Sequence, residues 1–331
     1  MSLILVFLQK AIDQALILLF GADGEILTEK SGNLNLGVPG IMYMGGIGGL
    51  MGAFLYEKAA AEPVAIVGLI ISLLCSVLCS AIAALIYSFL TITLRANQNV
   101  TGLALTTFGV GFGNFFGGSL SKLASGAGQI SAGQLSVPVT KTAYKASIPG
   151  LRDIPVLGDL FFGRGWMFYA VLIITLGLAF YLKKTRKGLN LRAVGENPGT
   201  ADAAGINVTK YKYIATIIGG IISGLGGLYF VMDFSGGTWT NNGLGENGWL
   251  AVALVIFAMW KPLNAIWCSV VFGALCILYL YIPGLNSHQK EIIKMLPYLI
   301  TVFVLVFTSL RKKKEQQPPA SLGLPYFREE R

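Results

Sequence analysis

Long apolar runs alternate with short polar connections along most of the chain. Several runs are long enough to cross a hydrocarbon core of about 30 Å as α-helices. The alternating segments of about ten residues that build a membrane β-barrel do not appear. We therefore expect an all-α polytopic membrane protein with about eight to ten transmembrane or re-entrant helices. The expected spans are residues 3–20, 41–56, 63–94, 100–118, 166–182, 212–231, 248–260, 263–282 and 293–310.

Some of these runs depart from the length of a simple crossing. Run 63–94 would form a helix of roughly 48 Å, so it must tilt, project from the membrane or break. Runs 41–56 and 248–260 are short, which favours re-entrant or broken segments. Glycines four residues apart, such as Gly220 and Gly224, predict close approach of helix backbones.

The composition excludes an ordinary soluble domain. Hydrophobic residues make up 54% of the 331 residues and charged residues only 12%, whereas soluble domains carry about 25% charged residues. The four cysteines lie in apolar runs without nearby histidine or carboxylate ligands, so no metal site is expected.

Basic residues are distributed unevenly among the polar connections. Residues 183–213 hold seven Lys and Arg and a basic run begins at Arg311, whereas residues 233–248 hold none. Since cytosolic connections are enriched in Lys and Arg, we expect the loop 183–212 and the C-terminus to be cytosolic. The loop 119–165 is then external, although it is itself basic. We expect residues 1–310 to form the transmembrane domain, and residues 311–331 a basic, disordered cytosolic tail.

The loop 183–212 carries the signals of a short helix. Asn197 is a good N-cap, Pro198 suits the first helical position, and Gly205 provides a stop. A helix of about two turns is not stable alone in water, so it needs a surface on which to dock. From these residues alone, an ordinary capped loop helix is an equally good interpretation.

Three sequence blocks resemble a known family. "LRAVGENPGTADAAGINVTKYKY" (191–213) looks like the cytosolic coupling segment of permease subunits from bacterial ABC importers. "GEILTEKSGNLNLGVPGIMYMGG" (24–46) and "FLTITLRANQNVTGLALTTFGVG" (89–111) resemble other blocks of the same branch. This branch carries branched-chain amino acids, monosaccharides such as ribose, and nucleosides. The likeness covers about residues 12 to 310 and is closest to nucleoside or simple-sugar permeases.

The chain departs from the family pattern at three positions in or directly before the second block. Pro39 stands where the family signature usually has an acidic residue, and Asp23 and Glu25 stand where small or apolar residues are commoner. Because Pro39 replaces the usual acidic residue, the role that the family gives to that residue is not assigned to this chain. Pro39 also predicts a bend in the second span, because proline removes a backbone hydrogen bond.

The resemblance implies a function in ATP-driven import by alternating access, with nucleosides as the favoured cargo and a monosaccharide such as ribose or galactose as the alternative. The chain has no G-x-x-x-x-G-K-[ST] motif, so ATP and Mg would be bound by a separate ATPase subunit and no cofactor by this chain. The implied coupling residues are Gly195, Glu196, Asn197, Pro198, Asp202, Ala204 and Gly205.

Further partners follow from the same resemblance. They are a second permease, more often a related chain than a second copy, and an extracytoplasmic substrate-binding protein. The chain would lie among the lipids of the bacterial cell membrane, and no nucleic-acid partner is expected. A neutral polar solute needs hydrogen-bonding and stacking groups along its path. The candidates for that path are Asn33, Asn35, Phe108, Phe112 and Asn114.

An ion-coupled secondary transporter is the alternative from another class. It would need titratable groups within the membrane, and Lys10 with Asp13 is the one pair of this kind that the expected spans contain. A membrane enzyme is less favoured, because His288 is the sole histidine and no acid, base and nucleophile converge, so no catalytic residue is expected.

Overall fold

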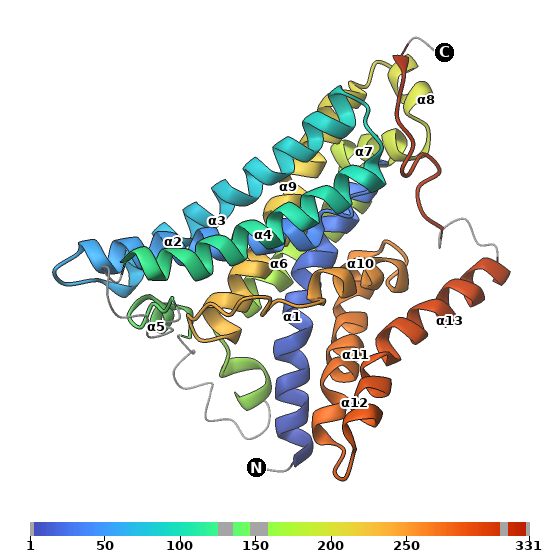
Figure 1. The fold of residues 1–331 in the computed structure, drawn as a ribbon. Helices are drawn as coiled ribbons and strands as arrows, with labels where there is room; N and C mark the ends of the chain where they lie inside the picture. Colours follow the sequence, from blue (N-terminus) through green and yellow to red (C-terminus); the bar gives the residue numbers. More distant parts are fainter. Residues whose placement is uncertain (1–2, 125–134, 146–157, 312–316, 329–331) are drawn as a thin grey trace.

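The computed structural model describes residues 3–124, 135–145, 158–311 and 317–328, and these residues are almost entirely helical (Figure 1). The first half contains α1 (Leu3–Glu29), α2 (Val38–Ala59), α3 (Ala65–Ser88) with the π-helical turn η1 (Phe89–Thr93), α4 (Gln98–Ala124), α5 (Thr140–Tyr144) and η2 (Gly158–Phe162). The second half contains α6 (Trp166–Lys184), α7 (Arg186–Glu196), α8 (Pro198–Ala203), α9 (Val208–Tyr229) with η3 (Phe230–Phe234), α10 (Asn247–Phe257), α11 (Pro262–Tyr281), α12 (Ser287–Lys294) and α13 (Leu296–Arg311).

Every expected span contains a helix, and six helices within the described ranges are long and apolar enough to cross a membrane. These six are α1, α2, α3 with η1, α6, α9 with η3, and α11. The long run 63–94 forms one continuous helix, Ala65–Thr93, whose last turn is the π-helical turn η1. The short run 248–260 forms only α10, which ends at Phe257.

One expected boundary and one expected bend are wrong. The first span continues to Glu29 instead of ending at residue 20, so three carboxylates assigned to a connection lie within α1. The last expected span, 293–310, begins at the end of α12 and otherwise corresponds to α13. Pro39 does not bend the second span, because it lies in the first turn of α2, where a missing backbone N–H leaves no helical hydrogen bond unmade.

The core is built around α1, α2 and α9. Helix α1 packs against α9, α10 and α11, while α2 packs against α3, α4 and α9. Glycines allow these backbones to approach: a Cβ added to Gly227 of α9 would lie 1.8 Å from the Met42 carbonyl oxygen of α2. A Cβ on Gly45 would lie 2.6 Å from the Gly224 carbonyl oxygen, as the glycine spacing predicts.

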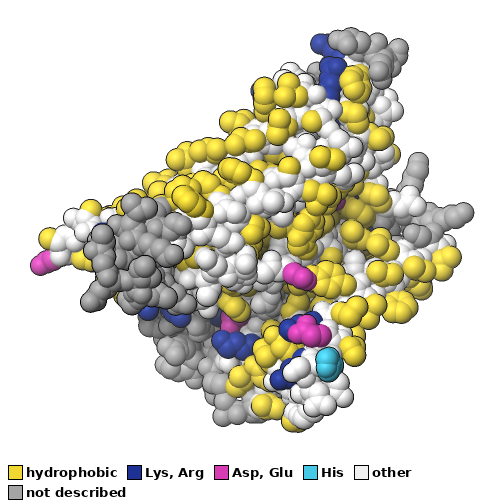
Figure 2. All heavy atoms as spheres, in the orientation of Figure 1, with side chains coloured by type: hydrophobic (Ala, Val, Ile, Leu, Met, Phe, Trp, Pro, Cys, Tyr) yellow, Lys and Arg dark blue, Asp and Glu magenta, His cyan; other side chains and the backbone are white. Residues whose placement is uncertain are grey.

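The outer surface is apolar. Large hydrophobic side chains are exposed along α3, including Ile66, Leu74 and Leu78, and along α13, including Phe303 and Val306. Figure 2 shows hydrophobic side chains covering much of the face drawn there. Apolar atoms on this scale would be unfavourable in water, and they match a surface surrounded by lipid tails.

The two ends of the bundle differ. Helices α7 and α8 lie at the top of Figure 1 with the tail 317–328 beside them, while α5 lies at the other end. At the α5 end, Ser136 forms a β-bridge with Thr238, and the Trp239 backbone N–H donates to the Leu135 carbonyl oxygen at 2.9 Å. The connections that contain residues 136 and 238 therefore lie at the same end of the bundle.

Residues 317–328, which belong to the tail that was expected to be disordered, contact the helical bundle in the structure. The backbone N–H and the hydroxyl of Ser321 both donate to the Gly195 carbonyl oxygen, at 3.0 and 2.6 Å. Leu322 packs against the main hydrophobic core, and Tyr326 packs against a smaller cluster beside α8. A polar, proline-containing composition indicated disorder, but these few apolar side chains find a preformed surface on α7 and α8.

Candidate functional site

The short helix α8 forms as its sequence signals predict. The Asn197 side-chain oxygen accepts a hydrogen bond from the Thr200 backbone N–H at 3.0 Å, and Pro198 occupies the first turn. The helix ends at Ala203, and Gly205 follows with φ of +83°, a conformation that glycine adopts without steric cost.

The preceding helix α7 was not predicted. Its N-cap is Thr185, whose hydroxyl oxygen accepts from the Gly188 backbone N–H at 3.0 Å. Gly188 and Gly195 weakened the helical signal, because glycine is a poor helix former. Both glycines are required by packing: a Cβ would lie 2.0 Å from the Tyr181 carbonyl oxygen at Gly188, and 2.3 Å from the Lys30 carbonyl oxygen at Gly195.

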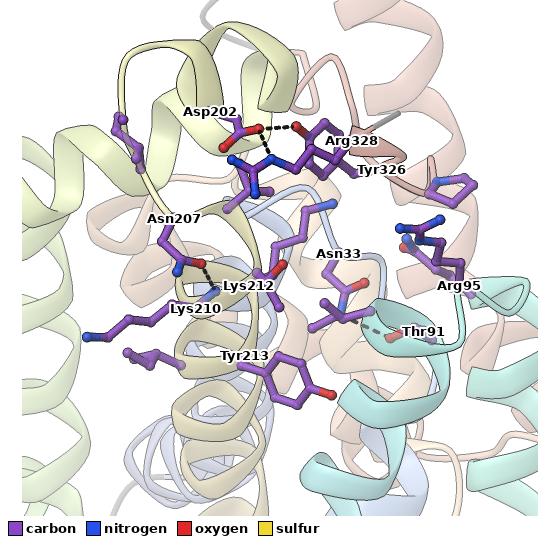
Figure 3. A pocket seen from close by; sticks show the side chains of 18 residues that line it. Asn33, Thr91, Arg95, Asp202, Asn207, Lys210, Lys212, Tyr213, Tyr326 and Arg328 are labelled. Atoms are coloured by element: carbon purple, nitrogen blue, oxygen red, sulfur yellow. Dashed lines mark hydrogen bonds and ion pairs between the residues drawn. The ribbon is translucent and has the colours of Figure 1, made fainter. Parts of the chain in front are cut away.

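Helix α8 docks on its own chain. Ala201 is buried with Val194 of α7 and Val208 of α9, and Tyr326 of the tail packs against this cluster. Asp202 accepts a hydrogen bond from the Tyr326 hydroxyl at 2.8 Å and pairs with the Arg328 guanidinium at 3.2 Å (Figure 3). The tail thus holds α8 through both apolar and charged contacts.

The expected coupling residues divide into two groups by exposure. Gly195 is buried against Lys30 and the tail, and Asp202 is largely covered by Tyr326 and Arg328. The other group is exposed and contains Glu196, Asn197, Ala204 and Gly205, with Pro198 partly exposed. These exposed residues belong to the surface that another protein can contact.

Lys30 connects the end of α1 to this segment. Burial lowers the pKa of Lys30, and the Glu196 carboxylate opposes that shift by favouring the charged ammonium. The end of α1 and the end of α7 are therefore coupled electrostatically as well as by the contact of Gly195 with the Lys30 carbonyl.

A cavity of about 800 Å³ opens beside α8. Its wall is formed by α8, the start of α9, η1 with the turn that follows it, and the tail. The residues labelled in Figure 3 include Asn33, Arg95, Lys212, Tyr213 and Arg328, which come from these elements and from the connection between α1 and α2. The cavity is thus polar and basic, and it lies directly next to the candidate coupling helix.

The expected substrate-path residues do not come together in one place. Asn33 lines the cavity beside α8, and its side-chain amide donates to the Thr216 hydroxyl at 3.0 Å. Asn35 is 1% exposed, and its side-chain oxygen accepts from the Gly37 backbone N–H at 3.0 Å in an Asx-turn that precedes α2. Asn35 also donates its backbone N–H to the Glu25 carboxylate at 3.0 Å.

The expected substrate-path residues on α4 are Phe108, Phe112 and Asn114, and they do not line the cavity beside α8. Phe108 and Phe112 line an open apolar hollow of about 730 Å³ on the surface of α4, together with Phe115 and Phe116. The amide groups of Asn114 and Asn242 are joined at 2.7 Å, which ties α4 to the connection after η3. Sequence proximity to glycines placed these residues in one group, whereas the helices separate them.

Three carboxylates of α1 are buried close to one another, although the sequence patterns did not predict it. Asp23, Glu25 and Glu29 of α1 are each 3% exposed or less. The Thr175 hydroxyl donates to Asp23 at 2.5 Å, and the Trp260 indole N–H donates to Glu29. The sequence signal for this cluster is the close spacing of the three carboxylates directly after an apolar run. The expected end of the first span at residue 20 placed them in a connection, so burial was not expected.

The Lys10 and Asp13 pair lies at the other end of the bundle. Their charged groups are 3.7 Å apart, and the Lys10 side chain is 61% exposed. Asp13 also pairs with Arg164, whose guanidinium donates to the Leu160 and Gln9 carbonyl oxygens at 2.7 and 2.8 Å. Asp13 is therefore part of a network that joins α1 to the segment before α6.

Comparison with known proteins agrees with this architecture. The family model for the branched-chain amino acid transport system permease component matches residues 7–305. The guanosine ABC transporter permease NupQ of Bacillus subtilis is 31% identical, over 95% of this chain and 94% of its own. The nucleoside ABC transporter permease NupC of Lactococcus lactis is 30% identical, over 87% of each chain. TsgC13 of Haloferax volcanii, provisionally named a glucose ABC transporter permease, is 30% identical over 97% of each chain.

The family match and the three relatives each extend over most of the chain, and the described helices supply the apolar spans that a permease requires. This multi-pass membrane protein belongs to the family of branched-chain amino acid transport system permease components.

Proposed function

We propose that this chain is the membrane-spanning subunit of an ATP-driven ABC importer and that its cargo is a nucleoside. The observation that carries the transport proposal is the docked helix α8, which is flanked by the exposed residues Glu196, at the end of α7, and Ala204 and Gly205, directly after α8. The cargo is favoured by NupQ and NupC, which are named for guanosine and for nucleosides.

The proposed mechanism needs no chemistry in this chain. A separate ATPase subunit binds ATP and Mg and contacts the accessible surface of α8. Movement of the ATPase then displaces α8 together with α7 and the tail, because Ala201, Asp202 and Gly195 join these three segments. Since a Cβ would not fit between Gly195 and Lys30, this displacement is transmitted to α1 by direct backbone contact.

The proposed placement is the bacterial cell membrane, with the α8 end and the C-terminus in the cytosol. Basic residues support this orientation: Lys183, Lys184, Arg186, Lys187, Arg192 and Lys210 are all exposed at the α8 end. A second permease, more often a related chain than a second copy, completes the pathway. An extracytoplasmic binding protein delivers the solute to the α5 end.

The test is ATP-driven uptake of labelled nucleosides and monosaccharides into proteoliposomes that contain the full complex. We expect Glu196→Ala and Ala204→Arg to lower uptake and substrate-stimulated ATP hydrolysis together, by about tenfold or more if the contact contributes about 1.4 kcal/mol. Glu62→Ala is the matched control, because Glu62 is an equally accessible carboxylate in the connection between α2 and α3. Full activity in both Glu196→Ala and Ala204→Arg would contradict the coupling role.

A monosaccharide is the second candidate cargo, and the relative TsgC13 favours it. Saturable uptake of glucose, ribose or galactose without uptake of any nucleoside would select this alternative. The same preparation separates the two cargoes, since only the labelled solute changes.

An ion-coupled transporter makes a different prediction for Asp13. If an ion gradient drove transport through Asp13, Asp13→Asn would abolish gradient-driven uptake. We expect ATP-driven uptake to persist in this variant, since Asp13 already pairs with Arg164 and Lys10 in a network that joins structural segments.

A further inference from the structure

The cavity beside α8 carries an excess of positive charge. Its wall contains four basic side chains and one carboxylate, namely Arg95, Lys210, Lys212, Arg328 and Asp202. Figure 3 shows the Lys210 side chain pointing away from the cavity, while Lys212 extends into it. The carboxylate of Asp202 is already occupied by Arg328 and by the Tyr326 hydroxyl. Among the described residues that line the cavity, Asp202 is thus the one carboxylate, and its printed partners are Arg328 and Tyr326, not Lys212.

Lys212 is the unusual member of this group. It is 3% exposed, and no hydrogen bond or ion pair joins its side-chain ammonium to another residue within the described ranges. Burying an ammonium group without a charge partner is strongly unfavourable. Lys212 also lines the cavity, so a ligand there can reach it. An anionic ligand would supply the missing partner.

Arg95 is held at the same cavity by an uncommon backbone conformation. Its φ of 56° lies in the left-handed region, which residues other than glycine seldom adopt. The guanidinium stacks on the Phe327 ring at 4.6 Å from the centroid, and no hydrogen bond or ion pair to another described residue occupies its N–H donors. A second cationic group thus faces the cavity from the turn between η1 and α4.

We propose that this cavity binds a phosphate group, with Lys212 and Arg95 as its charge partners. Lysine and arginine are the side chains that most often bind phosphate, and a volume of about 800 Å³ is within the range of ligand sites. The phosphate is carried either by a soluble phosphate ester or by a lipid headgroup, since both sources offer the same charged oxygens. The proposal concerns binding alone and is independent of the cargo and of ATP-driven transport.

The test for a soluble ligand uses the full chain, delipidated and purified in a maltoside detergent. Phosphorus NMR measures the binding of inorganic phosphate and of ribose 5-phosphate, and calorimetry compares ribose 5-phosphate with uncharged ribose. We expect ribose 5-phosphate to bind at least tenfold more tightly than ribose, and the affinity to fall as salt concentration rises. The test for a lipid ligand is native mass spectrometry of phosphatidylglycerol retained by the chain before delipidation.

Two variants and a matched control test whether Lys212 and Arg95 bind the phosphate group. We expect Lys212→Met to lower phosphate affinity or lipid retention at least tenfold, and Arg95→Gln to lower it several-fold. Lys183→Met removes an exposed lysine from the same end, outside the cavity, and should bind as the wild type does. Because Lys212→Met deletes a buried charge and keeps the side-chain length, its melting temperature should equal or exceed that of the wild type.

The proposal is overturned if neither phosphate source binds the wild type, or if Lys212→Met and Lys183→Met bind equally well. If Lys212→Met does not fold, Arg95→Gln decides the matter, and unchanged binding by that variant also overturns the proposal.

Discussion

The Tyr326 hydroxyl donates a hydrogen bond to the Asp202 carboxylate at 2.8 Å, so a residue 124 positions further along the chain holds a side chain near the C-terminal end of α8. Tyr326 also packs against the apolar cluster that buries Ala201. The candidate coupling helix is thus held by the tail as well as by the adjacent helices α7 and α9.

Removing that hydroxyl should loosen α8 without unfolding the protein. A hydrogen bond to a charged group contributes about 1.5 kcal/mol or more, which corresponds to roughly tenfold faster opening in Tyr326→Phe. Hydrogen exchange of the amides from Ala201 to Gly205, followed by mass spectrometry, measures this rate. Arg328→Gln is the comparison, because its side chain is 74% exposed and such surface pairs contribute about 0–1 kcal/mol. A larger effect in Arg328→Gln than in Tyr326→Phe would contradict the assignment.

The N-cap of α8 predicts a second local effect. Asn197→Ala removes the acceptor for the Thr200 N–H and should cost about 1 kcal/mol of helix stability. Trypsin cleavage at the exposed Lys210 should then become about fivefold faster, provided that local opening limits cleavage. Asn197→Asp keeps a capping oxygen and should be cleaved at the wild-type rate. Equal rates in all three proteins would show that the cap does not limit opening.

Glycine packing in the core predicts a matched pair of substitutions. Gly227→Ala places a methyl group 1.8 Å from the Met42 carbonyl oxygen, so α2 and α9 must separate. Gly177→Ala on α6 meets nothing within 4 Å. Overpacking costs typically 1–3 kcal/mol, so we expect Gly227→Ala to lower the melting temperature in detergent by about 5 °C or more. Gly177→Ala should leave it unchanged or slightly higher, and a similar loss in both would argue against tight packing at Gly227.

The buried pair of Asp23 and Thr175 predicts strong non-additivity. One oxygen of Asp23 accepts from the Thr175 hydroxyl, and the other has no hydrogen-bond partner among the described residues. Thr175→Val should therefore destabilise the protein by about 1–3 kcal/mol. In an Asp23→Leu background the same change should cost less than about 0.5 kcal/mol, because no polar group is left without a partner. Thermal unfolding of the four proteins in this cycle measures the coupling, and simple additivity would contradict it.

Local signals in the sequence predicted the elements that depend on neighbouring residues. The N-cap, proline and glycine around α8 acted within a few residues of one another, and the structure confirms that helix. The apolar runs likewise located a helix in every expected span. Where a boundary was wrong, as at Glu29, a long-range contact with Trp260 allowed a polar residue to continue the helix.

Contacts between distant segments could not be predicted from local patterns. The tail reads as disordered because its own residues cannot form a core, yet Ser321 and Tyr326 bind surfaces made by α7 and α8. The cavity beside α8 combines Asn33, Arg95 and Lys212 from three parts of the chain. Helix packing brings these three residues together, and their spacing in the sequence does not predict that they are neighbours.

The carboxylates of α1 bear on the order in which the chain is assembled. Thr175, which binds Asp23, is synthesised 152 residues later, and Trp260, which binds Glu29, is synthesised 231 residues later. A helix with such carboxylates enters a bilayer poorly on its own, because each ionised side chain carries an insertion penalty of about 2.5–3.5 kcal/mol at the helix centre. The polar contacts at the end of α1 are therefore complete only after α6 and the residues that follow α10 have been synthesised.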